Sequence, residues 1–183
     1  DGYEVTTYRL DGEYEDSRHP KEVTFTSSLE EDLKRRDFTI NAMAYNQEEG
    51  LVDLFGGMRD LQGKVIRAVG EPKERFTEDA LRIMRAVRFS AQLGFTIDEK
   101  TYEALAELSP NLKHISAERI QVELVKILTS KHPEYLEAAW ETGITRVILP
   151  EFDAMMETAQ NTPHHCYDVG RHALVSLMAV PAD

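Results

Sequence analysis

Charged and apolar positions repeat with helical spacing in residues 77–88, and the rest of the chain can be interpreted around this segment. A charged residue at every third position places Asp79, Arg82, Arg85 and Arg88 along one side of a helix. The apolar residues fall on the opposite side and can face a core: Ile83, Met84, Val87 and Ala91. Such a stripe is usually a solvated salt-bridge face. Three arginines and one carboxylate can instead hold a planar anionic ligand, because arginine only donates and ionised aspartate only accepts hydrogen bonds.

Before this helix, the pattern alternates between short strands and short helices. β-Branched and aromatic residues predict a strand at 3–9, and the Asp11-Gly12 turn signal predicts a hairpin partner near 13–14. Ser28 and Glu31 have the spacing of a capping box, which predicts a helix start. The remaining predicted elements are a strand at 23–26, a short helix at 38–44, and strands near Val52 and at 65–69.

After Pro72 the pattern is helical almost throughout. Thr77 is a suitable N-cap for the arginine helix, and Gly94 is a suitable residue to end it. The further predicted helices run from Asp98 to about 108, from Ser116, from Pro133 to Gly143 and from Asp168 onwards, with a short apolar segment at 144–149. The predicted fold class is therefore α+β and mostly helical, with a mixed α and β part followed by an all-α part.

The composition is that of an ordinary globular protein of 183 residues, with 42% apolar and 30% charged residues. Its single cysteine, Cys166, excludes an internal disulfide, and no Cys/His spacing typical of a zinc site occurs. No apolar run is long enough to cross a membrane, and the N-terminus has no signal-peptide pattern. We therefore expect a cytoplasmic protein without a membrane partner.

The net charge of −12 is distributed unevenly. Residues 59–88 contain eight lysines and arginines against five acidic residues, so this segment carries +3 and the rest of the chain −15. A strongly acidic protein is not expected to bind nucleic acid along an extended track. A local basic zone fits a defined phosphate site better.

A second group of polar residues occupies the short segment 35–41, with the sequence Arg-Arg-Asp-Phe-Thr-Ile-Asn. Here Arg36 suits a phosphate, Asp37 suits a ribose hydroxyl and Asn41 can brace the turn. Taken alone, such a segment is more often a surface ion-pair cluster that caps the next helix. Two other signals are weaker: a glycine pair at 56–57 that is more often a turn than a phosphate loop, and three histidines, His164, His165 and His172, that are more often structural than metal ligands.

The order of these segments is more specific than any one of them. The motif-bearing segments are 4–9, 16–20, 32–42, 53–57 and 78–85. Together they resemble the family of class II tRNA nucleotidyltransferases, the CCA-adding enzymes, and bacterial poly(A) polymerases. Within that resemblance, 35–42 is similar to the ribose-recognising motif, 78–88 to the nucleotide-base motif, and 116–123 to the helix that supports the base motif. Residues 161–172 are similar to the opening of an HD-type domain, with His172 at the first ligand position.

The resemblance implies a division into three parts and a reaction. Residues 1–70 would be the end of the catalytic head, 71–131 the helical neck and 132–183 the beginning of the body. The implied function is addition of C and A from CTP and ATP to the tRNA 3′ end by a Mg²⁺-dependent enzyme. The implied nucleotide-binding residues are Arg36, Asp37, Asn41, Asp79, Arg82, Arg85 and Arg88.

One departure from the family pattern bears on catalysis. The family's metal-binding Asp-x-Asp pair occurs nowhere in the sequence. We therefore expect the chain to start downstream of that pair, to contain no catalytic or metal-binding residue and to be inactive by itself. A poly(A) polymerase of the same family and a non-catalytic RNA-binding module remain alternatives.

Overall fold

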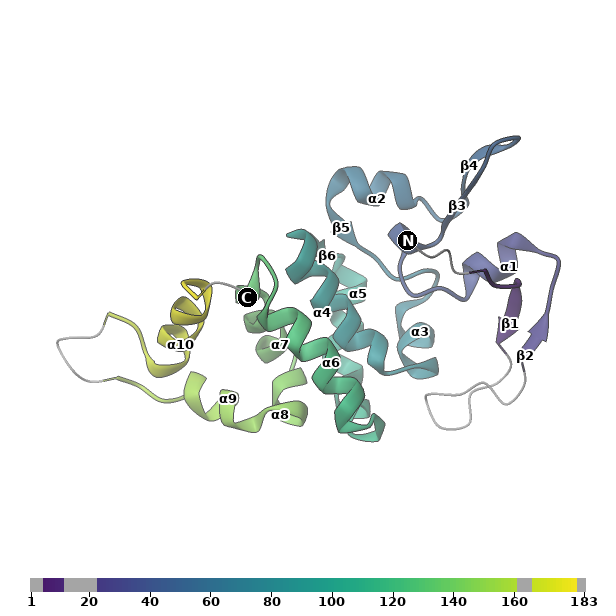
Figure 1. The fold of residues 1–183 in the computed structure, drawn as a ribbon. Coiled ribbons are helices and arrows are strands. Elements are labelled where there is room, and N and C mark those ends of the chain that lie inside the picture. Colours follow the sequence, from purple (N-terminus) through teal and green to yellow (C-terminus); the bar gives the residue numbers. More distant parts are fainter. Residues whose placement is uncertain (1–4, 12–22, 161–165, 181–183) are drawn as a thin grey trace.

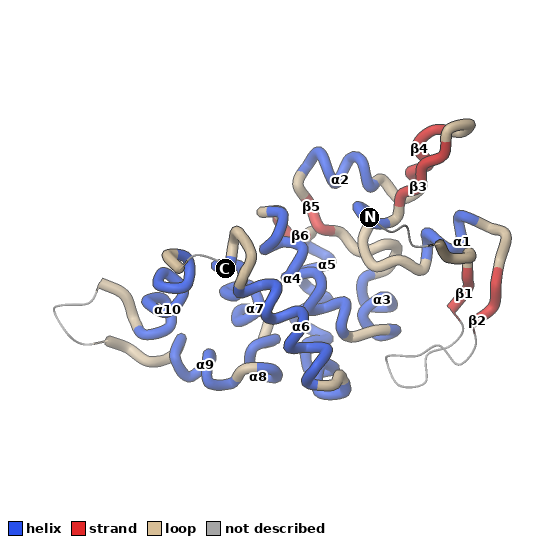
Figure 2. Tube along the Cα trace, viewed as in Figure 1, coloured by secondary structure: helices blue, strands red, loops and turns tan. Residues whose placement is uncertain are grey.

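The computed structural model describes residues 5–11, 23–160 and 166–180. Most of the short strands lie at one end, and helices form most of the remainder of the molecule (Figures 1 and 2). The strands are β1 (Arg9–Asp11), β2 (Val23–Phe25), β3 (Met43–Asn46), β4 (Gly50–Asp53), β5 (Val65–Ile66) and β6 (Thr96–Ile97). The helices are α1 (Leu29–Lys34), α2 (Gly57–Gly63), α3 (Pro72–Glu78), α4 (Leu81–Leu93), α5 (Glu99–Leu108), α6 (Ala117–Leu128), α7 (Leu136–Glu141), α8 (Ile144–Ile148), α9 (Pro150–Met156) and α10 (Val169–Met178).

The strands of the described ranges pair two by two: β1 with β2 and β3 with β4 in antiparallel fashion, and β5 with β6 in parallel. Of the strand predicted at 3–9, residues 3–4 lie outside the described residues and residues 5–8 form no strand, because β1 begins only at Arg9, which lies opposite Phe25. The partner predicted near 13–14 lies outside the described residues, and the observed partner is β2. β-Propensity marks residues that tolerate an extended backbone, but a strand exists only where a neighbour supplies hydrogen bonds.

The predicted arginine helix is interrupted at its start. Instead of one helix from Thr77, α3 ends at Glu78, Asp79 is extended, and α4 begins at Leu81. Thr77 does not cap a helix, because its hydroxyl donates to the Lys73 carbonyl inside α3 at 2.7 Å. Asp79 instead accepts from the Leu81 amide at 3.0 Å and so satisfies a free N–H at the start of α4. The predicted end is confirmed, because Gly94 adopts a left-handed backbone with φ of 66°.

The helix starts predicted at Ser28, Asp98 and Asp168 are confirmed, and a side-chain hydrogen bond caps each of these helices. Ser28 accepts from the Glu31 amide at α1, Asp98 from the Thr101 amide at α5, and Asp168 from the Arg171 amide at α10. These caps are local interactions, formed by residues three positions apart, so the sequence is sufficient to predict them.

Two predicted helices are wrong in type over part of their length. Residues 38–44 form a single 3₁₀ turn, Thr39–Asn41, and then enter β3. Residues 133–143 form the 3₁₀ turn Pro133–Tyr135 followed by the short helix α7. In the first case the strand β4 pairs with Met43–Asn46 and supplies the hydrogen bonds that a helix would otherwise make internally.

The hydrophobic core is centred on α4. Its predicted apolar side, Ile83, Met84, Val87 and Ala91, is fully buried, and α4 packs on α6, α3 and α7. One cluster of buried residues extends from Phe38 and Ile66 through α4 to Leu136 and Ile144. The parts predicted as head, neck and body therefore share a core here, and the boundaries at 70 and 131 remain a prediction. No helix among the described residues is both long enough and apolar enough to span a bilayer.

Candidate nucleotide-binding site

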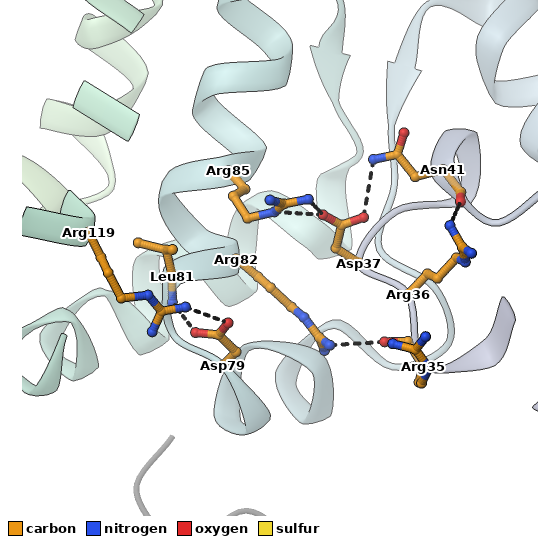
Figure 3. Close-up of a pocket in the computed structure, with 9 residues that line it drawn as sticks. All are labelled: Arg35, Arg36, Asp37, Asn41, Asp79, Leu81, Arg82, Arg85 and Arg119. Carbon is orange, nitrogen blue, oxygen red and sulfur yellow. Dashed lines mark hydrogen bonds and ion pairs between the residues drawn. The ribbon is translucent and has the colours of Figure 1, made fainter. Parts of the chain in front are cut away.

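A cavity of about 460 Å³ lies between the segment 35–41 and the start of α4 (Figure 3). The residues that line it are Arg35, Arg36, Asp37, Asn41, Asp79, Leu81, Arg82, Arg85 and Arg119. Two segments that are about forty residues apart in the sequence thus meet at one place. Six of the seven predicted nucleotide-binding residues line this cavity, and Arg88 does not.

The arginines of the 35–41 segment are oriented by a buried acid. Asp32, on the last turns of α1, contacts Arg35 Nη2 at 2.6 Å and Arg36 Nη2 at 3.2 Å. Burial by itself would raise the pKa of Asp32, but hydrogen bonds from Arg35, the Arg9 amide and Arg36 hold the pKa below its ordinary value. The carboxylate therefore stays ionised and anchors both guanidinium groups beside the cavity.

The Asp37 carboxylate is held from both sides of the cavity. Its Oδ2 accepts from Arg85 Nε at 2.7 Å and also from Arg85 Nη2. Its Oδ1 accepts from the Phe38 amide at 2.9 Å and from Asn41 Nδ2 at 3.2 Å. The neighbouring backbone is fixed as well, because the Asp37 carbonyl accepts from the Val69 amide at 3.1 Å. The predicted ribose residue thus sits on a rigid turn.

Asp79 lies at the junction of α3 and α4, facing the cavity. One of its oxygens caps α4 through the Leu81 amide, and the other accepts from Arg119 Nη2 of α6 at 3.1 Å. A carboxylate offers about four acceptor positions, so these two contacts leave capacity for a ligand donor.

Arg82 is nearly buried, and its guanidinium is held mainly by backbone carbonyls. Nη1 donates to the Arg75 carbonyl at 3.1 Å and to Glu78 at 2.7 Å, and Nη2 donates to the Arg35 carbonyl at 2.9 Å. These bonds use three of the five N–H donors of the side chain. The Arg35 contact also ties α4 directly to the 35–41 segment.

Arg88 points away from the cavity toward α6. Its Nε lies 2.6 Å from Glu123, and its guanidinium stacks 3.9 Å from the centre of the Phe89 ring. Burial lowers the pKa of the Arg88 side chain from its ordinary value, and the charge of Glu123 opposes that shift. We leave Arg88 out of the proposed binding site, because it serves as an ion pair between α4 and α6.

Sequence reasoning missed three residues that line the cavity: Arg35, Leu81 and Arg119. Arg119 could have been predicted from the sequence, since Arg119 and Glu123 are four residues apart and occupy one face of the helix that supports the base motif. Both contact the arginine stripe, Arg119 through Asp79 and Glu123 through Arg88. With five arginines and two aspartates, the cavity lining has a formal charge of +3, which suits an anionic ligand.

The glycine pair at 56–57 starts a helix. Gly56 has φ of 76°, and the amides of Gly57 and Met58 donate to Asp53 at 2.7 and 2.9 Å. These two amides are therefore bonded to Asp53 at the beginning of α2, so the glycine pair forms a turn rather than a phosphate loop.

The three histidines of the C-terminal segment gain no support as metal ligands. His164 and His165 lie outside the described residues, and His172 lies on α10. Over the described ranges, no cluster of three or more His, Cys, Asp or Glu side chains could hold a metal ion.

Comparison with known proteins agrees with the geometry. A family model described as "Poly A polymerase head domain" matches residues 1–67, and one described as "Probable RNA and SrmB- binding site of polymerase A" matches residues 94–156. A CCA-adding enzyme of Leuconostoc mesenteroides is 56% identical over 139 residues, which is 75% of this chain and 35% of that protein. The chain belongs to this nucleotidyltransferase family.

Solved structures of the nucleotidyltransferase family superpose on the chain. The Bacillus stearothermophilus CCA-adding enzyme in complex with CTP has 45% sequence identity and a TM-score of 0.70, and the match covers 76% of this chain and 33% of that one. The Thermotoga maritima CCA-adding enzyme complexed with tRNA has 34% identity and a TM-score of 0.60, over 75% and 33% of the two chains. The chain thus spans about a third of the length of these relatives.

Proposed function

We propose that this chain is the nucleotide-selecting part of a CCA-adding nucleotidyltransferase, which adds C and A from CTP and ATP to the tRNA 3′ end. One observation carries the proposal. One basic cavity is lined on one side by the segment 35–41, whose side chains suit a ribose and a phosphate. On the other side it is lined by Asp79, an acceptor, and Arg82, a donor, which suit the edge of a base. Relatives named CCA-adding enzymes, one of them in complex with CTP and one with tRNA, support it.

Asp79 and Arg82 are proposed to select the base by its edge. Cytosine and adenine each present an amino group beside an unprotonated ring nitrogen. Uracil and guanine present a carbonyl oxygen beside a ring N–H. An ionised carboxylate accepts from the amino group and a guanidinium donates to the ring nitrogen, so Asp79 and Arg82 match the first pair and mismatch the second. Both retain hydrogen-bonding capacity beyond their contacts within the protein.

The remaining residues are assigned by charge and position. Arg36, in the segment 35–41, is proposed to contact phosphate, and Asp37 with Asn41 is proposed to contact the ribose.

In the proposed reaction the tRNA 3′-hydroxyl attacks the α-phosphorus and pyrophosphate leaves. This chain would select and orient the nucleotide for that step. Mg²⁺ is the proposed cofactor of the whole enzyme, and because no fitting ligand cluster occurs in the described ranges, we assign it no ligand here.

Calorimetric titration of the chain with the four nucleoside triphosphates tests the proposal. We expect CTP and ATP to bind more tightly than UTP and GTP. Asp79→Ala should reduce the ratio of CTP to UTP affinity by about tenfold or more, because a mismatched buried polar group costs about 1–3 kcal/mol. Lys73→Ala is the matched control, since Lys73 lies on α3, the helix directly before Asp79, but pairs with Glu107 outside the cavity.

Two results would contradict the base-template proposal: unchanged C-over-U preference in Asp79→Ala, or no preference in the wild-type chain. A preference for ATP alone would favour the poly(A) polymerase alternative, which the description of the first family model supports. Absence of any nucleotide binding would favour the non-catalytic RNA-binding alternative.

A further inference from the structure

The acceptor capacity of the Asp37 carboxylate is fully used within the protein. Its four hydrogen bonds come from two Arg85 nitrogens, the Phe38 amide and the Asn41 side-chain amide. An ionised carboxylate has about four lone-pair positions. A ribose hydroxyl can therefore bind Asp37 only by replacing one of these partners, and the structure indicates which one.

Arg85 is the partner that is hardest to displace. It holds Asp37 through two nitrogens of one guanidinium, a charge-assisted pair that is roughly twice as strong as a neutral hydrogen bond. Its guanidinium also lies 5.5 Å from the centre of the Phe89 ring. Phe89 in turn packs edge-on against the fully buried Phe38 at a centroid distance of 5.7 Å. Arg85 and the segment 35–41, which contains Phe38, are therefore both held by the packing of Phe38 against Phe89.

Asn41 is the partner that is easiest to displace. Its hydrogen bond to Asp37 is the longest of the four, at 3.2 Å, and its donor is a neutral amide on a partly exposed side chain. A hydroxyl placed between the two groups can donate to Asp37 Oδ1 while its oxygen accepts from Asn41 Nδ2. Both original groups then keep a partner, so the exchange leaves no buried polar atom unsatisfied.

We infer that Arg85 is a positioning residue for ribose recognition: its two-nitrogen contact holds the Asp37 carboxylate in the orientation that lets a 2′-hydroxyl insert between Asp37 and Asn41. The inference rests on the proposed nucleotide-binding function. A 2′-deoxyribose has no group to insert, so the Asp37–Asn41 contact stays closed and the sugar gains nothing from it. Arg85 belongs to the helix that carries the base-selecting Arg82, so one element would position both the base and the sugar contacts.

The test is the ratio of CTP to 2′-deoxy-CTP affinity, measured by calorimetry on the 183-residue chain in the presence of Mg²⁺. For the wild type we expect CTP to bind about tenfold or more tightly, the effect of one hydrogen bond to a charged group. Arg85→Gln should bring the ratio close to one, because it removes the charge and the two-nitrogen contact. Arg85→Lys, which keeps the charge, should retain part of the preference for CTP over 2′-deoxy-CTP. Thermal unfolding of each variant reports its folding.

Arg88→Lys is the matched control, since it also removes a guanidinium from α4 but one that contacts Glu123 rather than Asp37. It should keep the wild-type ratio. A purely structural role for Arg85 would weaken CTP and 2′-deoxy-CTP equally, and an unchanged ratio in Arg85→Gln would overturn the inference. If Arg85→Gln does not fold, Arg85→Lys decides: a ratio reduced by about threefold or more supports the inference and an unchanged ratio overturns it. The wild-type preference for CTP over UTP tests the proposed function separately.

Discussion

Removing the carboxylate of Glu123 should destabilise the fold through the charge that it leaves behind. Glu123 on α6 lies 2.6 Å from Arg88 Nε on α4, and the two side chains are only 6% and 11% exposed. Lys126 also lies 3.7 Å from Glu123 but is far more exposed. In Glu123→Ala the Arg88 guanidinium would therefore stay buried between α4 and α6 without its counter-ion.

The expected loss follows from that burial. Removing one partner of a buried ion pair typically costs about 3–5 kcal/mol, against a total stability of about 5–15 kcal/mol for a domain. Because Arg88 keeps its stacking on Phe89 and a small exposed fraction, we expect the lower end, about 3 kcal/mol. For a chain of this length, that corresponds to a fall in Tm of about 6–12 °C.

Urea unfolding followed by circular dichroism measures the change, with the m-value as a check on two-state behaviour. Replacing both partners by apolar residues, in the double variant Arg88→Met with Glu123→Leu, should restore most of the lost stability, because no unpaired charge remains. Lys73→Ala is the control for an ion pair at the surface and should have no measurable effect. A loss below about 1 kcal/mol in Glu123→Ala, the range of exposed pairs, would refute the reasoning.

Two further predictions concern stability. Gly57→Ala should cost about 1–3 kcal/mol in urea unfolding, because its Cβ would meet the Thr39 carbonyl oxygen at 2.3 Å, whereas Gly63→Ala, with its nearest contact at 3.7 Å, should be tolerated; equal effects would contradict the packing argument. Acid should also destabilise the fold. The pKa of Asp32 is lowered in the folded state, so its contribution is present above the unfolded pKa of about 4 and is lost as pH falls through the folded value. The loss of stability between about pH 5 and 3 should be smaller in Asp32→Asn than in the wild type.

Much of the helical part could be predicted because it depends on local interactions. Ser28, Asp98 and Asp168 cap helices through amides three residues away, and Gly94 ends α4 because a left-handed backbone suits glycine. The apolar side of α4 followed from its spacing alone. The errors arose where a distant partner decides the conformation, as with β1, which depends on β2, and with residues 43–46, which pair with β4.

By itself, the sequence identified six of the nine residues that line the candidate site, but it missed Arg35, Leu81 and Arg119 and included Arg88, which does not line it. The identities of Arg36, Asp37, Asn41, Asp79, Arg82 and Arg85 indicated a basic, acceptor-bearing site, and the order of the motifs indicated a family, which the comparisons confirmed. The tertiary structure decided what each side chain contacts. Arg85 reaches Asp37 across 48 positions and Arg119 reaches Asp79 across 40, while Arg88, one turn further along the same helix, turns to Glu123. Helical periodicity places arginines on a shared side, but only the elements packed against that side supply their partners, so the partners differ from one arginine to the next.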